Sequence, residues 1–343
     1  MKGNAIANAN AAATAAIPKA RFDWLPLALV AGLALLALPA IGSPSTWVTL
    51  TVAGLAMGMI VFIIASGLTL VFGLMDVLNF GHGVFIALGA FVATSVLGAM
   101  GDWTNSTSLW FNFAAVLPAM FVAMAVAGAV GWAFERVMVR PVYGQHLKQI
   151  LITMGGMIIG EELIKVIWGP AQLPLPLPEA MRGSLVFGDA SIEKFRVIAF
   201  TIGAIVLALM LFTLNRTKLG LLIRAGVQDR EMVESLGYRI RRLFVGVFVV
   251  GSGLAGLGGA LGADILGVEP TFPLKFMVSF LIVCAVGGTS SIAGPLVAAL
   301  VLGLADVMGK YYVPKLGGFI VYALMIAILL WRPQGLFTRD GRK

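Results

Sequence analysis

The chain has 343 residues, of which 59% are apolar, 12% are charged and 42 are glycine. A water-soluble domain carries about twice that share of charged residues, so this composition excludes a soluble globular protein and indicates lipid as the solvent. The net charge of +8 does not indicate a nucleic-acid partner, because the basic residues lie in short loops between apolar runs, where they orient a membrane protein. The single cysteine, Cys284, excludes an internal disulfide framework, and we expect a buried, unreactive thiol.

Apolar segments of membrane-crossing length follow a low-complexity tail, residues 1–23, which we expect to be disordered. There are ten, and the eighth and ninth are shorter than a full crossing. They are Trp24–Ile41, Trp47–Phe72, Val84–Met100, Phe111–Phe134, Ile150–Trp168, Val197–Leu214, Leu243–Leu266, Phe276–Val286, Pro295–Val307 and Gly318–Trp331. The pattern predicts an all-α membrane protein, a polytopic bundle of 8–10 transmembrane helices with glycine-broken segments, spanning residues 24–332 and followed by a short tail, 333–343.

Basic residues are distributed unequally between the two sides of this arrangement. Alternating the ten segments across the bilayer places 17 Lys and Arg residues on one side and six on the other. The loop 215–242 alone contributes seven of them. Because cytoplasmic loops carry the excess of positive charge, we expect both tails and this loop to lie in the cytoplasm.

Glycines recur every two or three residues in the segment 243–266. They are Gly251, Gly253, Gly256, Gly259 and Gly262. Small residues at such spacing let helix backbones approach closely. The pattern predicts a packing face here in preference to a functional site.

A polar, glycine-containing stretch separates the second and third apolar segments. It contains Asp76, Asn79, Gly81, His82 and Gly83. Irregular polar backbone at membrane depth is tolerated where it lines a cavity or is buried in protein, which makes Asn79 to Gly83 a candidate for the solute pathway. The alternative is a cytoplasmic turn in which Asn79 caps the next helix and His82 finds local partners.

A second break lies between the two short segments, at Gly287, Gly288, Ser290, Ser291 and Gly294. Pro295 suits the first turn of a new helix, whose N-terminal amides would favour an anionic group such as a carboxylate. This predicts a second pathway element, and a tight turn between two helices is the alternative. A nucleotide-binding loop is excluded, because no Lys-Ser or Lys-Thr ends the stretch.

The loop 215–242 contains a short helical pattern. Asp229 and Glu231 stand where a helix N-terminus favours negative charge, and Gly237 suits the residue just past a helix end. Met232, Val233 and Leu236 are predicted to share one face. The helix is too short and too mixed in charge for a membrane anchor, so we expect a docking ridge for a protein partner.

Three charged residues, Glu161, Glu162 and Lys165, lie inside the fifth apolar segment. Glu161 and Lys165 are four residues apart and can pair on one helix face, which lowers the cost of charge in lipid. A structural pair near the outer interface is the favoured interpretation, and a functional pair is the alternative.

Four features in chain order resemble the H-type permease subunit of high-affinity branched-chain amino acid ABC importers. Residues 79–83 are similar to that family's Asn-Phe-Ala-His-Gly, with Gly81 in place of Ala. Residues 287–294 are similar to its Gly-Gly-Leu-Gly-Ser-Ile-x-Gly, with Thr289 and Ser290 in place of Leu-Gly. Residues 332–337 match its C-terminal signature, and together with the loop 215–242 the resemblance extends from Val48 to Phe337.

The resemblance implies a permease domain whose cytoplasmic loop docks into an ATPase subunit. The residues it places on the coupling helix are Arg224, Asp229, Arg230, Glu231 and Gly237. Met232 and Val233 replace the small pair usual in importer coupling loops, a change that docking should survive.

By the same resemblance, the partners are two ATPase subunits, a second permease of M type and an extracytoplasmic solute-binding protein in a bacterial inner membrane. The chain itself would be no enzyme and hold no cofactor, because ATP would be bound by the partner subunits. The sequence contains no Walker A motif, so energy must come from outside it.

Two other functions fit the pattern of residues. An ion-coupled secondary transporter could use the intramembrane acids as proton or sodium sites. These are Asp76, Glu161, Glu162, Asp264 and Asp306. A passive channel is the third class, and relatives that handle urea, short amides or other carboxylates share much of the resemblance.

Overall fold

The computed structural model describes residues 28–35, 42–288, 292–333 and 335–336. The helices are α3 (Pro44–Met75), α4 (His82–Ala99), α5 (Gly101–Thr104), α6 (Leu109–Phe134), α7 (His146–Trp168), α8 (Lys194–Arg216), α9 (Lys218–Gln228), α10 (Arg230–Ser235), α11 (Ile240–Leu266), α12 (Phe272–Gly287), α13 (Ala293–Tyr312) and α14 (Gly317–Trp331). A helical stretch over residues 28–35, short helical turns at Glu135–Val139, Arg140–Val142 and Glu179–Met181, and a hairpin of β1 (Ser184–Phe187) and β2 (Ala190–Glu193) complete the described part. The predicted tail 1–23 lies outside it, as does most of 333–343.

The helices confirm the predicted polytopic membrane protein. Six helical stretches, among them α3, α4, α8, α11 and α13, are long and apolar enough to cross a membrane. The sixth is α6 together with the turns that extend it to Val142. The helices α12 and α14 are shorter but apolar, as predicted for the segment that begins at Phe276. The prediction of a short segment from Pro295 is wrong, because α13 is 20 residues long and apolar enough to cross. The helix α7 has 23 residues and runs alongside them, but its four Lys and Glu residues set it apart from the six.

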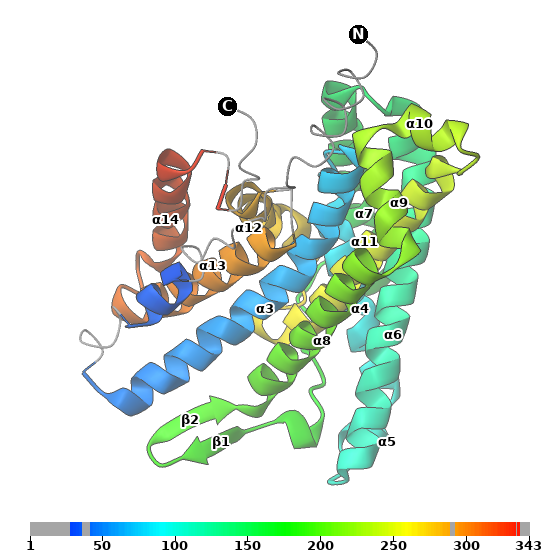
Figure 1. The fold of residues 1–343 in the computed structure, drawn as a ribbon. Helices are drawn as coiled ribbons and strands as arrows, with labels where there is room; N and C mark the ends of the chain where they lie inside the picture. The colour runs from blue at the N-terminus through cyan, green and yellow to red at the C-terminus, as the bar shows by residue number, and fades with distance from the viewer. Residues whose placement is uncertain (1–27, 36–41, 289–291, 334, 337–343) are drawn as a thin grey trace.

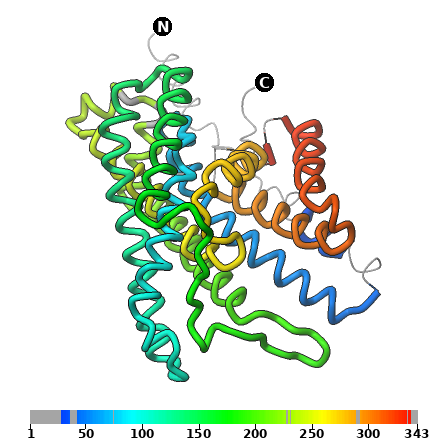
Figure 2. Tube along the Cα trace, turned by 180° about the vertical axis from the view of Figure 1, so that it is seen from behind, coloured from blue at the N-terminus to red at the C-terminus, as the bar shows by residue number. Residues whose placement is uncertain are grey.

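Successive long helices run in alternating directions between two ends of the molecule (Figures 1 and 2). One end carries α9 and α10, and we refer to it as the coupling end. The opposite end carries β1 and β2, and we refer to it as the hairpin end. The helices α3, α6, α8, α12 and α14 run toward the coupling end, while α4, α7, α11 and α13 run away from it.

The helix α3 lies at the centre of the bundle. Of its most apolar 18-residue window, 89% is buried, against 22% for the corresponding window of α8. The helices α4, α11 and α13 pack directly on α3 or on one another, and α6, α8 and α14 cover them from outside. The exposed side of an outer helix is apolar, as expected of a surface that faces lipid or another membrane subunit.

The glycines of α11 are a packing face, as predicted. A Cβ at Gly251 would lie 2.8 Å from the carbonyl oxygen of Gly67 in α3. A Cβ at Gly256 would overlap Ala127 of α6, and Gly89 of α4 faces the backbone of Gly256 from the other side. Backbones therefore meet where α11 crosses three neighbours, and a side chain at these positions would separate them.

The hairpin end is closed by short irregular elements. Leu173, in the proline-rich stretch after α7, donates its backbone N–H to the Val268 carbonyl after α11, with an N···O distance of 2.9 Å. The strands β1 and β2 pair antiparallel, with Ser184 opposite Glu193 and Phe187 opposite Ala190. These contacts hold the ends of α7, α8 and α11 near one another.

Candidate functional site

The first polar break is folded into the protein interior. The helix α3 ends at Asp76, which adopts a left-handed conformation with φ of 53°, and the chain then turns back along α3. His82 reaches Ile64 of α3, 11 residues before Met75. At about 1.5 Å per helical residue, His82 lies on the order of 16 Å below the end of α3. The break is therefore folded deep into the helix bundle, where Asn79 and His82 are buried, and a simple surface turn is the wrong interpretation for Asn79 to Gly83.

The polar side chains of this break have few partners. The His82 Nε2 atom lies 3.2 Å from the Ile64 carbonyl oxygen, and its Nδ1 atom has no partner among the described residues. Asn79 is 1% exposed, and neither its amide nitrogen nor its amide oxygen is paired within the described part of the chain. The helix α4 begins after Gly81 without a side-chain cap, so the alternative in which Asn79 caps it is wrong.

The break needs glycine at two positions, because neighbouring helices lie too close to leave room for a side chain. A Cβ on Gly81 would overlap the ring of Phe134, and one on Gly83 would lie 2.8 Å from the Cα of Pro273. The backbone N–H of Phe80 donates to the hydroxyl of Thr153 in α7, with an N···O distance of 3.1 Å. The break is thus packed against α6, α7 and α12 and encloses no large space.

The second break is also closed by backbone contact. Gly287 ends α12, and a Cβ there or at Gly294 would overlap the backbone of the other segment. Gly288 follows with φ of 78°. Pro295 lies in the first turn of α13, as predicted. The predicted pathway residues Ser290 and Ser291 lie outside the described residues.

The C-terminal signature packs onto this second break. The backbone N–H of Leu336 donates to the Val286 carbonyl with an N···O distance of 2.7 Å, and Leu336 is fully buried. A Cβ on Gly335 would lie 3.0 Å from the backbone nitrogen of Gly288. Two motifs that are far apart in the sequence therefore form one joint, a relation that the spacing of the residues did not predict.

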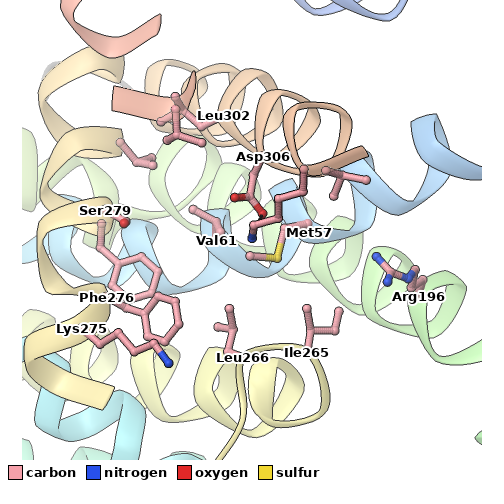
Figure 3. Close-up of a pocket in the computed structure, with 16 residues that line it drawn as sticks. Met57, Val61, Arg196, Ile265, Leu266, Lys275, Phe276, Ser279, Leu302 and Asp306 are labelled. Atoms are coloured by element: carbon pink, nitrogen blue, oxygen red, sulfur yellow. Dashed lines mark hydrogen bonds and ion pairs between the residues drawn. The ribbon is translucent and has the colours of Figure 1, made fainter. Parts of the chain in front are cut away.

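A cavity of about 550 Å³ extends from the hairpin end to the middle of the bundle. It lies between the middle of α3, the start of α8, the end of α11, most of α12, the second half of α13 and Val321 of α14 (Figure 3). Its polar lining residues include Arg196, Lys275, Ser279, Asp306 and Lys310. None of the described pathway residues predicted from the sequence lines it. The volume falls within the range of about 300–1,000 Å³ typical of small-ligand pockets.

Sequence reasoning identified one residue of this cavity, Asp306, and only as an alternative ion site. A further signal was present, because Asp306 and Lys310 are four residues apart within an apolar helix. Their side chains form an ion pair with an Nζ···Oδ2 distance of 2.7 Å. Arg196 and Lys275 lie in different helices, and only the tertiary fold brings them to the same cavity.

The loop 215–242 forms two helices at the coupling end instead of the single helix predicted. Thr217 caps α9, and the Asp229 side chain caps α10 by accepting from the Met232 N–H, with an N···O distance of 2.9 Å. Gly237 has φ of +86°, as expected of the residue after a helix. Arg230 and Glu231 occupy the first turn of α10.

The two helices are anchored to the bundle on one side only. Arg224 donates to the Leu214 carbonyl at the end of α8, with an N···O distance of 2.5 Å. Val233 is 5% exposed, whereas Met232 and Leu236 are 62% and 69% exposed. The prediction that these three share one face is therefore wrong: Val233 faces the protein and the other two face outward, as a docking surface requires.

The charged group of α7 is paired as predicted. The Nζ atom of Lys165 lies 2.9 Å from Glu161 and 2.8 Å from Glu162. Glu161 is 6% exposed, so its carboxylate is buried with a cation beside it. Within the described residues, His, Cys, Asp and Glu side chains form no group of three that could hold a metal ion. Cys284 is a buried free thiol, as expected.

Known proteins match most of this chain. The family described as branched-chain amino acid transport system permease component matches residues 50–329. The permease protein LivH of Escherichia coli K12 is 27% identical over 295 residues, which cover 83% of this chain and 94% of LivH. BraD of Pseudomonas aeruginosa is 28% identical over 296 residues, with the same two coverages.

An M-type relative matches as well. LivM of Escherichia coli K12 is 28% identical over 309 residues, which cover 81% of this chain and 68% of LivM. No solved structure matches the chain. The family match extends from α3 through α14, over both breaks and the loop 215–242. The chain therefore belongs to the family of permease components of branched-chain amino acid transport systems, as its motifs predicted.

Proposed function

We propose that this chain is the H-type permease subunit of an ABC importer that carries branched-chain amino acids across a bacterial inner membrane by alternating access. The observation that carries the proposal is the projection formed by α9 and α10 at one end of a helix bundle that belongs to a transport permease family. A projection held at its base by Arg224 and Val233, with Met232 and Leu236 outward, suits a separate motor protein.

In this proposal the coupling end faces the cytoplasm and both termini lie there, as the excess of Lys and Arg indicates. Two ATPase subunits bind ATP and dock on α9 and α10, so the chain itself needs no cofactor and performs no covalent chemistry. A second permease of M type completes the pathway, and an extracytoplasmic binding protein delivers solute to the hairpin end. The match to both H-type and M-type relatives supports the pair of permeases.

Movement of the docked ATPases would reach the bundle through α8. Arg224 holds α9 to the end of α8, and Asp229 fixes the start of α10. The two breaks then provide places where rigid helices can pivot, because irregular backbone interrupts them at membrane depth. In this mechanism Asn79 and His82 are pathway residues whose unpaired polar atoms gain partners as the breaks move.

An ion-coupled transporter is less well supported. Of the acids that could serve it, Glu161 and Glu162 pair with Lys165, and Asp306 pairs with Lys310. Asp76 is exposed near the surface, with His146 3.6 Å away. In these pairs the carboxylates of Glu161, Glu162 and Asp306 are neutralised by lysines and leave no excess negative charge to hold a proton or sodium ion. Asp264, the fifth of these acids, is exposed.

Uptake by the assembled complex in proteoliposomes tests the proposal. The chain, its M-type partner, the ATPase subunits and the binding protein are reconstituted, and radiolabelled leucine is followed with and without ATP. We expect leucine uptake that requires ATP. Uptake that persists on a proton or sodium gradient without ATP would identify a secondary transporter instead.

The variant Glu231→Ala tests the coupling surface in the same vesicles. We expect it to reduce ATP-driven uptake by about tenfold or more and to weaken co-purification of the ATPase, because one charged contact at a docking surface commonly contributes 1–3 kcal/mol. Thr201→Ala, on the exposed side of α8, serves as the control and should leave uptake unchanged. Equal uptake by both variants would contradict the assignment of α10 to coupling.

A further inference from the structure

The hairpin-end cavity combines an apolar wall with charged groups at its edge. Met57, Val61, Leu266, Phe276 and Phe280 are among its apolar lining residues. Figure 3 shows Lys275, Arg196 and Asp306 around these side chains, each projecting from a different helix. Such a combination of an apolar body and a few convergent polar groups is typical of a pocket for a small amphiphilic molecule.

Each cation of the cavity already has a carboxylate partner. Lys310 pairs with Asp306 and Lys275 pairs with Glu269, both at 2.7 Å, and Arg196 pairs with Glu193 at 2.6 Å. The Lys275 and Lys310 side chains are more than half exposed, while the Asp306 side chain is 20% exposed. Exposed ion pairs are worth only about 0–1 kcal/mol, so a ligand can replace one partner at little cost.

We propose that this cavity is a binding subsite for a zwitterionic amino acid with an aliphatic side chain. Asp306 accepts the α-ammonium group in place of Lys310, and Lys275 receives the α-carboxylate, while Arg196 lies across the cavity from Lys275. The aliphatic side chain lies against Met57, Val61 and Phe276. This subsite rests on the proposed import function and specifies where this subunit holds the solute.

The position of the cavity agrees with that role. The start of α8 and the end of α11, which lie at the hairpin end, line it together with the middle of α3 and most of α12. In the proposed orientation it therefore lies on the extracytoplasmic side, where a binding protein would release its solute. The chemistry needs both signs of charge, which separates a zwitterion from a simple carboxylate.

Thiol labelling of the assembled complex in membranes tests the subsite directly. Ser279→Cys introduces a thiol into the cavity. The chain's native cysteine, Cys284, is buried and should not react with the methanethiosulfonate reagent used for labelling. We expect leucine to slow the reaction of the introduced thiol with this reagent at least fivefold. Ser191→Cys on β2 lies outside the cavity and should label at the same rate with and without leucine.

The ligand 4-methylpentanoate, which has the side chain and carboxylate of leucine but no ammonium group, tests the role of Asp306. It should protect Ser279→Cys at least tenfold less well than leucine, and Asp306→Asn should abolish this difference. Equal protection by both compounds, or none by leucine, would overturn the subsite even where the wild-type complex imports leucine. If leucine protects Ser279→Cys but the wild-type complex shows no ATP-driven uptake, the subsite proposal stands and the importer proposal is rejected.

Discussion

The first polar break and the hairpin-end cavity use polar residues in opposite ways. In the break, Asn79 and His82 are buried with few partners, while glycines bring four helices into contact and leave no large space. In the cavity, the charged side chains are paired and partly exposed around about 550 Å³ of open volume. The difference supports our proposals that the break is a tightly packed part of the pathway where helices pivot and that the cavity holds the solute.

Adding bulk to the break should have the largest effect on stability. In Gly83→Leu, the new side chain would meet the backbone of Pro273, which cannot move without displacing α12. We expect a loss of more than about 3 kcal/mol and little folded protein, because overpacking against backbone is not relieved by a rotamer change. Thermal unfolding in detergent and the yield of monodisperse protein measure it.

Gly98→Leu on the same helix is the matched control, since nothing lies within 4 Å of a Cβ at Gly98. This variant should unfold within a few degrees of the wild type. If both variants behave alike, the break is not the tight joint that the contacts describe.

A milder change in the same break should be reversible by a second substitution. Gly81→Ala places a methyl group against the Phe134 ring, and we expect a loss of about 1–3 kcal/mol. Phe134→Leu, which opens that space, should restore about 1 kcal/mol or more in the double variant relative to the sum of the single effects. Additive effects in this double-mutant cycle would show that the two residues do not constrain each other.

Adding bulk to the cavity should have the smallest effect on stability and a large one on transport. Val61→Phe fills part of the open volume, so we expect a change of less than about 1 kcal/mol in stability. Leucine uptake by the reconstituted complex should fall at least tenfold, because the new ring would occupy the space proposed for the side chain of leucine. Unchanged uptake would show that the cavity does not lie on the solute pathway and does not hold leucine during transport.

Much of the helix arrangement could be predicted from the sequence. Apolar segments such as Trp47–Phe72 and Leu243–Leu266 coincide with α3 and α11 because lipid requires every backbone group to be paired within a helix. Gly237 and Asp229 also behave as predicted, since helix ends follow local rules of capping and backbone conformation. The face of α10 was predicted wrongly, because which side of a short helix is covered depends on the bundle beneath it.

The sequence by itself determined the solvent, the helices, the places where they break and the family, since these depend on composition and on residues close together in the chain. Only the tertiary structure decided that the first break folds back to Ile64 and that Leu336 closes the second. It alone brought Arg196, Lys275 and Asp306 around one cavity. The physical reason is that a pocket is formed by side chains from several helices, whose relative positions depend on packing contacts that no single stretch of sequence contains.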